Sequence, residues 1–234
     1  MVYSQRADGR KFDELRPIEA KVGVIKRADG SAMFKIGKTI ALAAVYGPRA
    51  LHPTFLRNPE TGILRCNYNM LAFSGSGERV RPGPSRRSKE LGLVIEKALS
   101  PVLDLRAFPD SVVDVYIELI QTDSGTRCAG ITAAAMALAD AGLPMRDLVA
   151  AVSVGLVGDK VVVDLNKEEE DYEEGATDVP IAMTSVDNKI TLLQLDGNAT
   201  KEQMKELLEY AKKACSKIHE IQKKALKDRF IVRR

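Results

Sequence analysis

The chain has 234 residues, of which 45% are hydrophobic and 29% are charged, a composition that excludes a disordered chain, a collagen and a coiled-coil rod. Lys and Arg number 35 and Asp and Glu 32, so the net charge of +3 indicates no partner by itself, and any nucleic-acid surface has to come from local clustering. Because domains usually span about 100–200 residues and no linker-like stretch divides the sequence, we expect a single domain over residues 1–234.

Short strands are predicted in the first third of the chain. Apolar stretches are bounded there by turn signals, among them Asp29-Gly30 and Gly37-Lys38. The predicted strands are 20–25, 32–36, 39–46 and 65–74. The first three form an antiparallel meander because only short turns join them, and the fourth leads into a polar loop rich in Gly, Ser and Pro.

Helices and strands alternate in the remainder of the chain. Apolar residues at helical spacing follow Ser85 and Ser88, either of which can cap a helix that ends at Pro101. The other predicted elements are a strand at 112–120, a small-residue helix at about 128–141, a hairpin of strands at 150–157 and 160–164, an acidic loop at 165–178, strands at 180–184 and 189–194, and a long amphipathic helix at about 200–227. This order predicts an α+β fold in which helices pack on mixed sheets.

Several classes of protein are excluded by the sequence. No apolar run approaches the roughly 20 residues needed to cross a bilayer, and the polar start of the chain is unlike a signal peptide. Three widely spaced cysteines indicate neither a disulfide framework nor a zinc site, so we expect a cytoplasmic protein with no membrane partner. The two histidines, His52 and His219, lack the neighbours of a catalytic histidine, which leaves any catalysis to carboxylates, arginines and backbone amides.

A basic cluster precedes the first predicted helix. It holds four arginines within nine residues: Arg79, Arg81, Arg86 and Arg87. Arginines beside a helix N-terminus form a favourable site for phosphate groups, so the cluster predicts a track for a nucleic-acid backbone. Arg65 and Arg49 can extend this track, and Tyr68 can stack on a base. A solvated basic loop is the alternative interpretation.

A small polar turn joins the strand at 112–120 to the helix that follows it. Backbone N–H groups and hydroxyls of Ser124, Gly125 and Thr126, together with the guanidinium of Arg127, form a generic oxyanion site. The turn is not a nucleotide-binding P-loop, because it lacks the GxxxxGK pattern. An ordinary helix cap made by Asp123 or Ser124 is the alternative.

An acidic segment follows the predicted hairpin. Its carboxylates are Asp164, Glu168, Glu169, Glu170, Asp171, Glu173, Glu174 and Asp178. Such a run is usually a solvated loop, but it can also supply a general acid with a raised pKa or hold a divalent cation. Asp178 stands out because it directly precedes the apolar stretch that begins at Val179. Combined with a phosphate site and a basic track, these carboxylates predict attack of inorganic phosphate on a phosphodiester.

Five short segments are distinctive when taken in order along the chain. They are Arg6-Ala7-Asp8-Gly9-Arg10, Ala44-Val45-Tyr46-Gly47-Pro48-Arg49, Arg81-Pro82-Gly83-Pro84-Ser85-Arg86-Arg87, Gln121-Thr122-Asp123-Ser124-Gly125-Thr126-Arg127 and Asp164-Leu165-Asn166. Together they resemble the ribonuclease PH family of phosphorolytic 3′→5′ exoribonucleases, and within it the catalytic ribonuclease-PH-like subunits of archaeal exosomes. The resemblance covers nearly the whole chain.

The resemblance implies a fold, an assembly and a reaction. The fold would consist of two βαβ-type halves related to the second domain of ribosomal protein S5. The assembly would be a hexameric ring in which this subunit alternates with a non-catalytic homologue, with RNA-binding cap subunits on one face and single-stranded RNA in the channel. The reaction would be reversible phosphorolysis of RNA to nucleoside 5′-diphosphates, with inorganic phosphate as co-substrate and Mg²⁺ or Mn²⁺ as cofactor.

The resemblance also assigns roles by position. Phosphate binding falls on Ser124, Gly125, Thr126 and Arg127, and RNA binding falls on Arg86, Arg87, Arg65, Arg49, Tyr68 and His52, the last in a channel-constriction loop. Catalysis and metal binding fall on Asp171 and Asp178, with Asp171 as the general acid and Glu170 and Glu174 as alternatives. The two aspartates lie seven residues apart, farther than is usual in the family.

Two other functions share much of this pattern. A stand-alone homohexameric ribonuclease PH that trims tRNA 3′ ends would have the same chemistry and a different assembly. A non-catalytic ring subunit would only bind RNA and partners, and it would have no need of an oxyanion turn beside an acidic pair. We therefore expect the catalytic exosome subunit.

Overall fold

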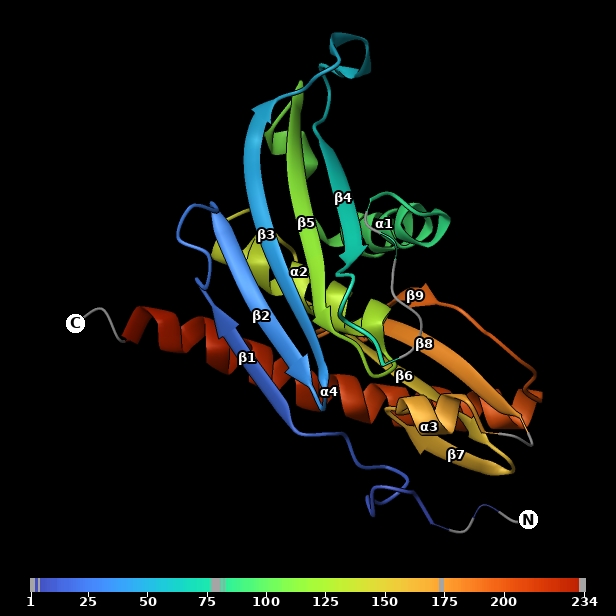
Figure 1. Cartoon of the computed structure of the whole chain (residues 1–234). Helices are drawn as coiled ribbons and strands as arrows, with labels where there is room; N and C mark the ends of the chain where they lie inside the picture. The colour runs from blue at the N-terminus through green and yellow to red at the C-terminus, as the bar shows by residue number, and fades with distance from the viewer. Residues whose placement is uncertain (1–2, 4, 77–80, 82, 173–174, 232–234) are drawn as a thin grey trace.

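The structure is a computed structural model that describes residues 3, 5–76, 81, 83–172 and 175–231 (Figure 1). Arg79 of the basic cluster and Glu173 and Glu174 of the acidic segment lie outside the described residues.

The first sheet contains strands from the first half of the chain. They are β1 (Ile18–Val22), β2 (Gly30–Ile36), β3 (Thr39–Ala50), β4 (Ile63–Met70) and β5 (Ser111–Gln121), in the spatial order β1-β2-β3-β5-β4. The meander β1-β2-β3 is antiparallel, and β5 pairs antiparallel with β3. Helix α1 (Arg86–Leu99) connects β4 to β5, which pair in parallel, as a strand crossover through a helix requires.

The second sheet contains strands from the second half of the chain. They are β6 (Val149–Val157), β7 (Lys160–Val163), β8 (Ala176–Thr184) and β9 (Ile190–Leu193), in the spatial order β7-β6-β8-β9. Every pair in this sheet is antiparallel. Within the described part of the chain, the parallel pairing of the expected βαβ halves is therefore confined to the first sheet.

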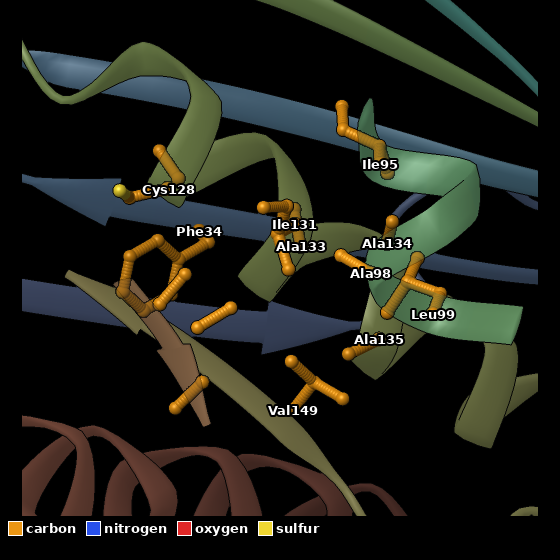
Figure 2. Close-up of a cluster of buried hydrophobic side chains, with 14 of the residues drawn as sticks. Phe34, Ile95, Ala98, Leu99, Cys128, Ile131, Ala133, Ala134, Ala135 and Val149 are labelled. Atoms are coloured by element: carbon orange, nitrogen blue, oxygen red, sulfur yellow. The ribbon is translucent and has the colours of Figure 1, made fainter. Parts of the chain in front are cut away.

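Helix α2 (Thr126–Asp140) packs between the two sheets, where it contacts β2 and β3 on one side and β6 on the other. Its small residues allow this close packing, and Figure 2 shows its alanines beside Ile95, Ala98 and Leu99 of α1 and Val149 of β6. Because α2 is buried on nearly every side, it lacks the polar face of a surface helix. Its burial fixes the position of its N-terminus, which forms part of the pocket described below.

Helix α4 (Lys201–Ile231) runs along the base of the molecule and contacts β1 of the first sheet and β6 and β7 of the second (Figure 1). Its apolar face, including Leu207, Ala211 and Ile218, joins a core that also contains residues of both sheets. Within the described residues, no helix is long and apolar enough to cross a membrane.

The α+β class and most predicted elements are confirmed, with shifts of a few residues at their ends. Two differences affect the acidic segment. A short helix, α3 (Lys167–Glu170), forms where a loop was predicted, because Asn166 and Glu169 make a reciprocal capping box. Strand β8 begins at Ala176, so Asp178 lies within the strand and not at its entrance.

Candidate active site

A pocket of about 330 Å³ lies between the first sheet and the second. The end of β4, the N-termini of α1 and α2, and parts of β6, α3 and β8 form its walls. The lining residues are Tyr68, Asn69, Met70, Gly75, Ser76, Gly83, Ser85, Arg87, Ser88, Thr122, Ser124, Gly125, Thr126, Arg127, Cys128, Ser153, Lys167, Glu170, Asp178 and Pro180. Because both halves of the chain contribute, the pocket exists only when they are packed together.

Two helix N-termini meet at this pocket. Ser85 caps α1 in a reciprocal bond with Ser88, and the exposed Arg87 follows in the first turn. Helix α2 begins next to Gly125 with no side-chain cap, so the alternative of a cap by Asp123 or Ser124 is wrong. The first N–H groups of a helix have no partner within the helix and carry partial positive charge, so both ends favour an anion in the space between them.

The turn before α2 has an unusual backbone that the rest of the fold holds in place. Ser124 and Gly125 are both left-handed, with φ of 58° and 64°. Buried Thr39 accepts a hydrogen bond from the N–H of Asp123 (2.9 Å) and donates one to the carbonyl of Ser124 (2.8 Å). The buried Ser124 hydroxyl has no hydrogen-bond partner among the described residues, so it is available to form a hydrogen bond with a ligand.

Arg127 extends from the first turn of α2 toward the second sheet. Its Nη1 atom donates a hydrogen bond to Oε1 of Gln194 at 2.7 Å. This contact orients the guanidinium beside the turn, where its remaining N–H groups can bind phosphate oxygens in the bidentate manner that arginine favours. The structure thus brings together the four predicted phosphate-binding residues, Ser124, Gly125, Thr126 and Arg127.

Asp178 faces the same pocket from β8. Burial raises the pKa of Asp178, and repulsion from Glu170 and Asp196 adds to this, while a hydrogen bond from the Ser153 hydroxyl and the charge of Arg127 act in the opposite direction. A carboxyl with a raised pKa retains its proton to higher pH than an ordinary aspartate, which is the property that a general acid needs.

The remaining acidic residues divide into three environments. Glu169 is buried, and its two oxygens accept hydrogen bonds from Arg6 at 2.7 and 2.8 Å, so it anchors α3. Glu170 is exposed and lines the pocket. Asp171 is exposed, pairs with Nζ of Lys167 at 2.6 Å and is not among the lining residues.

The residues expected to bind RNA are dispersed. Arg87 lines the pocket and Arg86 is its exposed neighbour on α1. Arg65 lies earlier on β4, where Asp114 accepts hydrogen bonds from its Nε and Nη2 atoms at 2.6 and 3.0 Å. Arg49 and His52 are exposed at the end of β3 and in the loop that follows, toward the upper end of the sheet in Figure 1.

Tyr68 is placed differently from its expected role. Its side chain is buried, only 4% exposed, and its ring packs toward Gly130 of α2. Little of the ring is therefore exposed for stacking, although Tyr68 is one of the residues that line the pocket. Burial raises the pKa of the Tyr68 hydroxyl, which lies beside Thr126 at the pocket wall and therefore remains a hydrogen-bond donor at neutral pH.

Few carboxylates are placed where they could hold a divalent cation in this pocket. Among the residues that the structure describes, no group of three or more His, Cys, Asp or Glu side chains is arranged to hold a metal. Mg²⁺ commonly needs only one or two carboxylates when substrate phosphates supply other ligands. Asp178 and Glu170 both line the pocket and meet that requirement, and Glu170 also lies 3.7 Å from Nζ of Lys167, whereas Asp171 pairs with Lys167 and is not among the lining residues.

Three residues at or behind the pocket were not predicted from the sequence. Ser153 donates to Asp178 from the centre of β6, and its only signal is a hydroxyl within an apolar strand. Thr39 and Arg16 support the turn from behind and come from distant parts of the chain. Nothing in their local sequence connects them to residues 123–125.

Comparisons with known proteins agree with this arrangement. A model of the 3′ exoribonuclease family, domain 1, matches residues 14–144, and a model of domain 2 of that family matches residues 147–214. The chain is 53% identical to exosome complex component Rrp41 of Pyrococcus furiosus over 97% of this chain and 90% of that protein. It is 48% identical to Rrp41 of Methanopyrus kandleri over 96% of this chain and 93% of that protein.

Solved structures show the same fold. Rice Rrp46 superposes with a TM-score of 0.79 at 26% identity, covering 94% of this chain and all of that one. A chain of the Archaeoglobus fulgidus exosome, solved with RNA bound to the active site, superposes with a TM-score of 0.78 at 27% identity and covers 92% of both chains.

Proposed function

Because the chain belongs to the 3′ exoribonuclease family of ribonuclease PH proteins, we propose that it is the catalytic, phosphorolytic 3′→5′ exoribonuclease subunit of an archaeal-type exosome ring. It shortens single-stranded RNA with inorganic phosphate and releases nucleoside 5′-diphosphates. The reverse reaction, addition of nucleotides to an RNA 3′ end, follows from the same chemistry.

One observation carries the proposal. Two helix N-termini, the guanidinium of Arg127 and the protonatable Asp178 converge on a single pocket of about 330 Å³. The first three groups attract phosphate oxygens, and the fourth can donate a proton. A purely structural ring subunit would not require a proton donor beside an anion site.

In the proposed reaction, inorganic phosphate binds at Ser124, Gly125, Thr126 and Arg127. One of its oxygens attacks the phosphorus of the last phosphodiester of the RNA. The bond from that phosphorus to the 3′-oxygen of the preceding nucleotide breaks, and the terminal nucleotide leaves as a diphosphate. The departing 3′-oxygen takes a proton, which we assign to Asp178 because its carboxyl lies in the pocket and its pKa is raised.

The RNA backbone is proposed to follow Arg87 and Arg86 toward the pocket. Arg65, Arg49 and His52 are proposed as more distant contacts for upstream nucleotides, since they lie farther along the first sheet and its connecting loop. Tyr68 is proposed to act through its hydroxyl at the pocket wall.

A divalent cation, Mg²⁺ or Mn²⁺, is proposed as a cofactor that Glu170 and phosphate oxygens would hold, with the carboxylate of Asp178 as a further ligand only in its ionised form. When bound, it would neutralise the charge that accumulates as two phosphate groups meet. The catalytic and metal-binding roles that the resemblance assigns to Asp171 remain predictions, which substitution of Asp171 can test.

The proposed partners are a non-catalytic ribonuclease-PH-like homologue, with which this chain alternates in a hexameric ring, and RNA-binding cap subunits. The support is the identity to exosome components over nearly the whole chain. The proposed location is the cytoplasm. The competing assembly is a homohexameric ribonuclease PH, which would be active without a second subunit.

The test is a phosphate-dependence assay with a single-stranded RNA labelled throughout with ³²P. The purified chain is assayed alone and with the non-catalytic homologue, with and without phosphate and Mg²⁺. Nucleoside diphosphates that appear only with phosphate and only in the mixture support the exosome subunit. Diphosphates from the chain alone favour the homohexamer. Monophosphates, or RNA binding without any cleavage, contradict phosphorolysis by this chain.

A further inference from the structure

Arg16 lies behind the phosphate-binding turn, in the segment that precedes β1. Its side chain is 5% exposed, although it carries a full positive charge. A buried arginine is costly unless its N–H groups are satisfied and its charge is paired. Its contacts therefore indicate what it supports.

One set of contacts joins Arg16 to the second half of the chain. The Nε and Nη2 atoms of Arg16 donate to the two carboxylate oxygens of Asp164 at 2.9 and 2.7 Å, and the backbone N–H of Arg16 adds a third bond at 2.8 Å. Asp164 is itself 2% exposed and left-handed, with φ of 56°. It follows β7 and stands just before α3, which carries Lys167 and Glu170 into the pocket.

The other set joins Arg16 to the phosphate-binding turn. Its Nη1 atom donates to the backbone carbonyl of Asp123 and lies 3.5 Å from the carboxylate of the same residue. The Nη2 atom would lie 3.4 Å from a Cβ placed on Gly125. The guanidinium therefore lies against the turn and fixes the direction of the Asp123 carbonyl. Without this hydrogen bond, the partially negative carbonyl oxygen could point toward bound phosphate.

The surroundings of Arg16 leave it little freedom. Gly37, with φ of 57°, lies against its stem, and a Cβ there would come within 2.5 Å of Cδ. Thr39, two residues after Gly37, also forms hydrogen bonds with Ser124 and Asp123. A non-glycine residue in the left-handed region, as Ser124 is, is strained and persists only when its surroundings hold it there.

We propose that Arg16 is a positioning residue for the phosphate site: it locks the turn at 123–125 to Asp164, so that the turn and α3 face each other across the pocket. Arg16 does not touch phosphate; it acts through the carbonyl of Asp123 and the carboxylate of Asp164. The role rests on the proposed function, in which phosphate is the co-substrate bound at this turn.

The test compares Arg16→Lys with wild type in the assembled, RNA-binding complex. Lysine keeps the charge, but it lacks the planar guanidinium whose N–H groups bond Asp164 and Asp123 at the same time. We expect the KM for phosphate and the dissociation constant of inorganic phosphate to rise about tenfold to a hundredfold, the effect of removing a hydrogen bond to a charged group. The affinity for RNA should stay within about twofold, the scatter of an independent site.

Arg10→Lys is the matched control. Arg10 also bonds to Asp164, at its backbone carbonyl (3.2 Å) and at carboxylate Oδ2 (3.5 Å), but none of its hydrogen bonds to described residues reaches residues 123–125. Its phosphate KM should therefore stay close to wild type. Equal effects of the two substitutions would assign Arg16 a general stabilising role and overturn the proposal.

Thr39→Val keeps the proposal testable if Arg16→Lys does not fold. Valine preserves the shape of threonine but removes both hydrogen bonds to the turn, and Thr39→Ser should restore phosphate affinity. Calorimetric titration with inorganic phosphate measures the site even if the wild-type chain proves inactive on RNA, which separates failure of this inference from failure of the proposed function. The positioning role would be contradicted if phosphate affinity were unchanged in both Arg16→Lys and Thr39→Val. If Arg16→Lys does not fold, unchanged affinity in Thr39→Val alone would contradict it.

Discussion

Two walls of the same pocket, both proposed to bind phosphate groups, are built in different ways. The turn at 123–127 is largely buried, has two left-handed residues and is held by Thr39, Arg16 and Gln194. The wall formed by the start of α1 is exposed, and Arg86 and Arg87 form no ion pair there with a described residue. The first wall is held by hydrogen bonds within the protein, and the second consists of exposed side chains at a capped helix end.

The difference matches what each wall has to bind. Inorganic phosphate is small and identical in every cycle, so a rigid site loses little entropy and orients the attacking oxygen well. An RNA backbone advances by one nucleotide per cycle, so a rigid site would hold it in one register. Exposed arginines attract it electrostatically without fixing it. Substitutions in each wall can separate these two modes of binding.

The largest effect is expected for Asp178→Asn. Asparagine keeps the size of the side chain but cannot donate the catalytic proton, so kcat should fall by about 10²–10⁴-fold while RNA affinity is retained. Single-turnover kinetics and RNA binding on the same preparation measure this. Asp171→Asn is the companion variant: a loss as large as that of Asp178→Asn would restore Asp171 as the general acid, and a small loss would leave the role to Asp178.

Arg127→Ala tests the preorganised wall. Removal of a charge-assisted interaction with phosphate should raise the phosphate KM by about tenfold to a hundredfold without a comparable change in RNA affinity. Arg127→Lys separates charge from geometry, since lysine restores the charge but not the hydrogen bond to Gln194 or a bidentate grip. A phosphate KM that is unchanged in Arg127→Ala would remove this residue from the phosphate site.

The exposed wall is tested by Arg86→Ala combined with Arg87→Ala. RNA affinity should fall, and the slope of log affinity against log salt should become shallower by about 0.7 for each RNA phosphate that an arginine no longer neutralises. The phosphate KM should be nearly unchanged, because neither residue belongs to the turn. RNA titrations between low and moderate salt measure the slope, and an unaltered slope would contradict a backbone track at α1.

The smallest effect, measured at saturating Mg²⁺ so that loss of a proposed cation ligand does not dominate, is a shift of the pH profile in Glu170→Gln. The negative charge of Glu170 helps to raise the pKa of Asp178, so its removal should lower that pKa. A general acid works in its protonated form, so kcat falls as pH rises through its pKa. In a plot of kcat against pH, the falling limb should therefore move to lower pH in Glu170→Gln. A falling limb at the wild-type pH would mean that another group controls proton donation to the 3′-oxygen.

Much of the architecture could be predicted from the sequence because it depends on local signals. Alternation and turn residues located most strands, and apolar spacing located α1, α2 and α4 within a few residues of their ends. The phosphate-binding turn was also predicted locally, since small residues before a helix expose backbone N–H groups wherever the helix packs. The ordered motifs further predicted the family, which the comparisons confirmed.

Tertiary structure decided which of these pieces meet. The sequence assigned Asp171 and Asp178 the same roles, but Asp171 is exposed and pairs with Lys167, whereas Asp178 is held in strand β8 beside Ser153, where burial raises its pKa. Tyr68 is expected from the sequence to stack on a base, yet tertiary packing leaves its side chain only 4% exposed.

Sequence by itself determined the chemical groups that are available, because propensity, turn formation and backbone N–H exposure act over a few residues. Only the packing of two sheets around α2 decided their distances, burial and pKa values, because those quantities depend on neighbours from other elements of the chain. Arg16 shows this most clearly: its bonds to Asp123 and Asp164 join residues 107 and 148 positions apart.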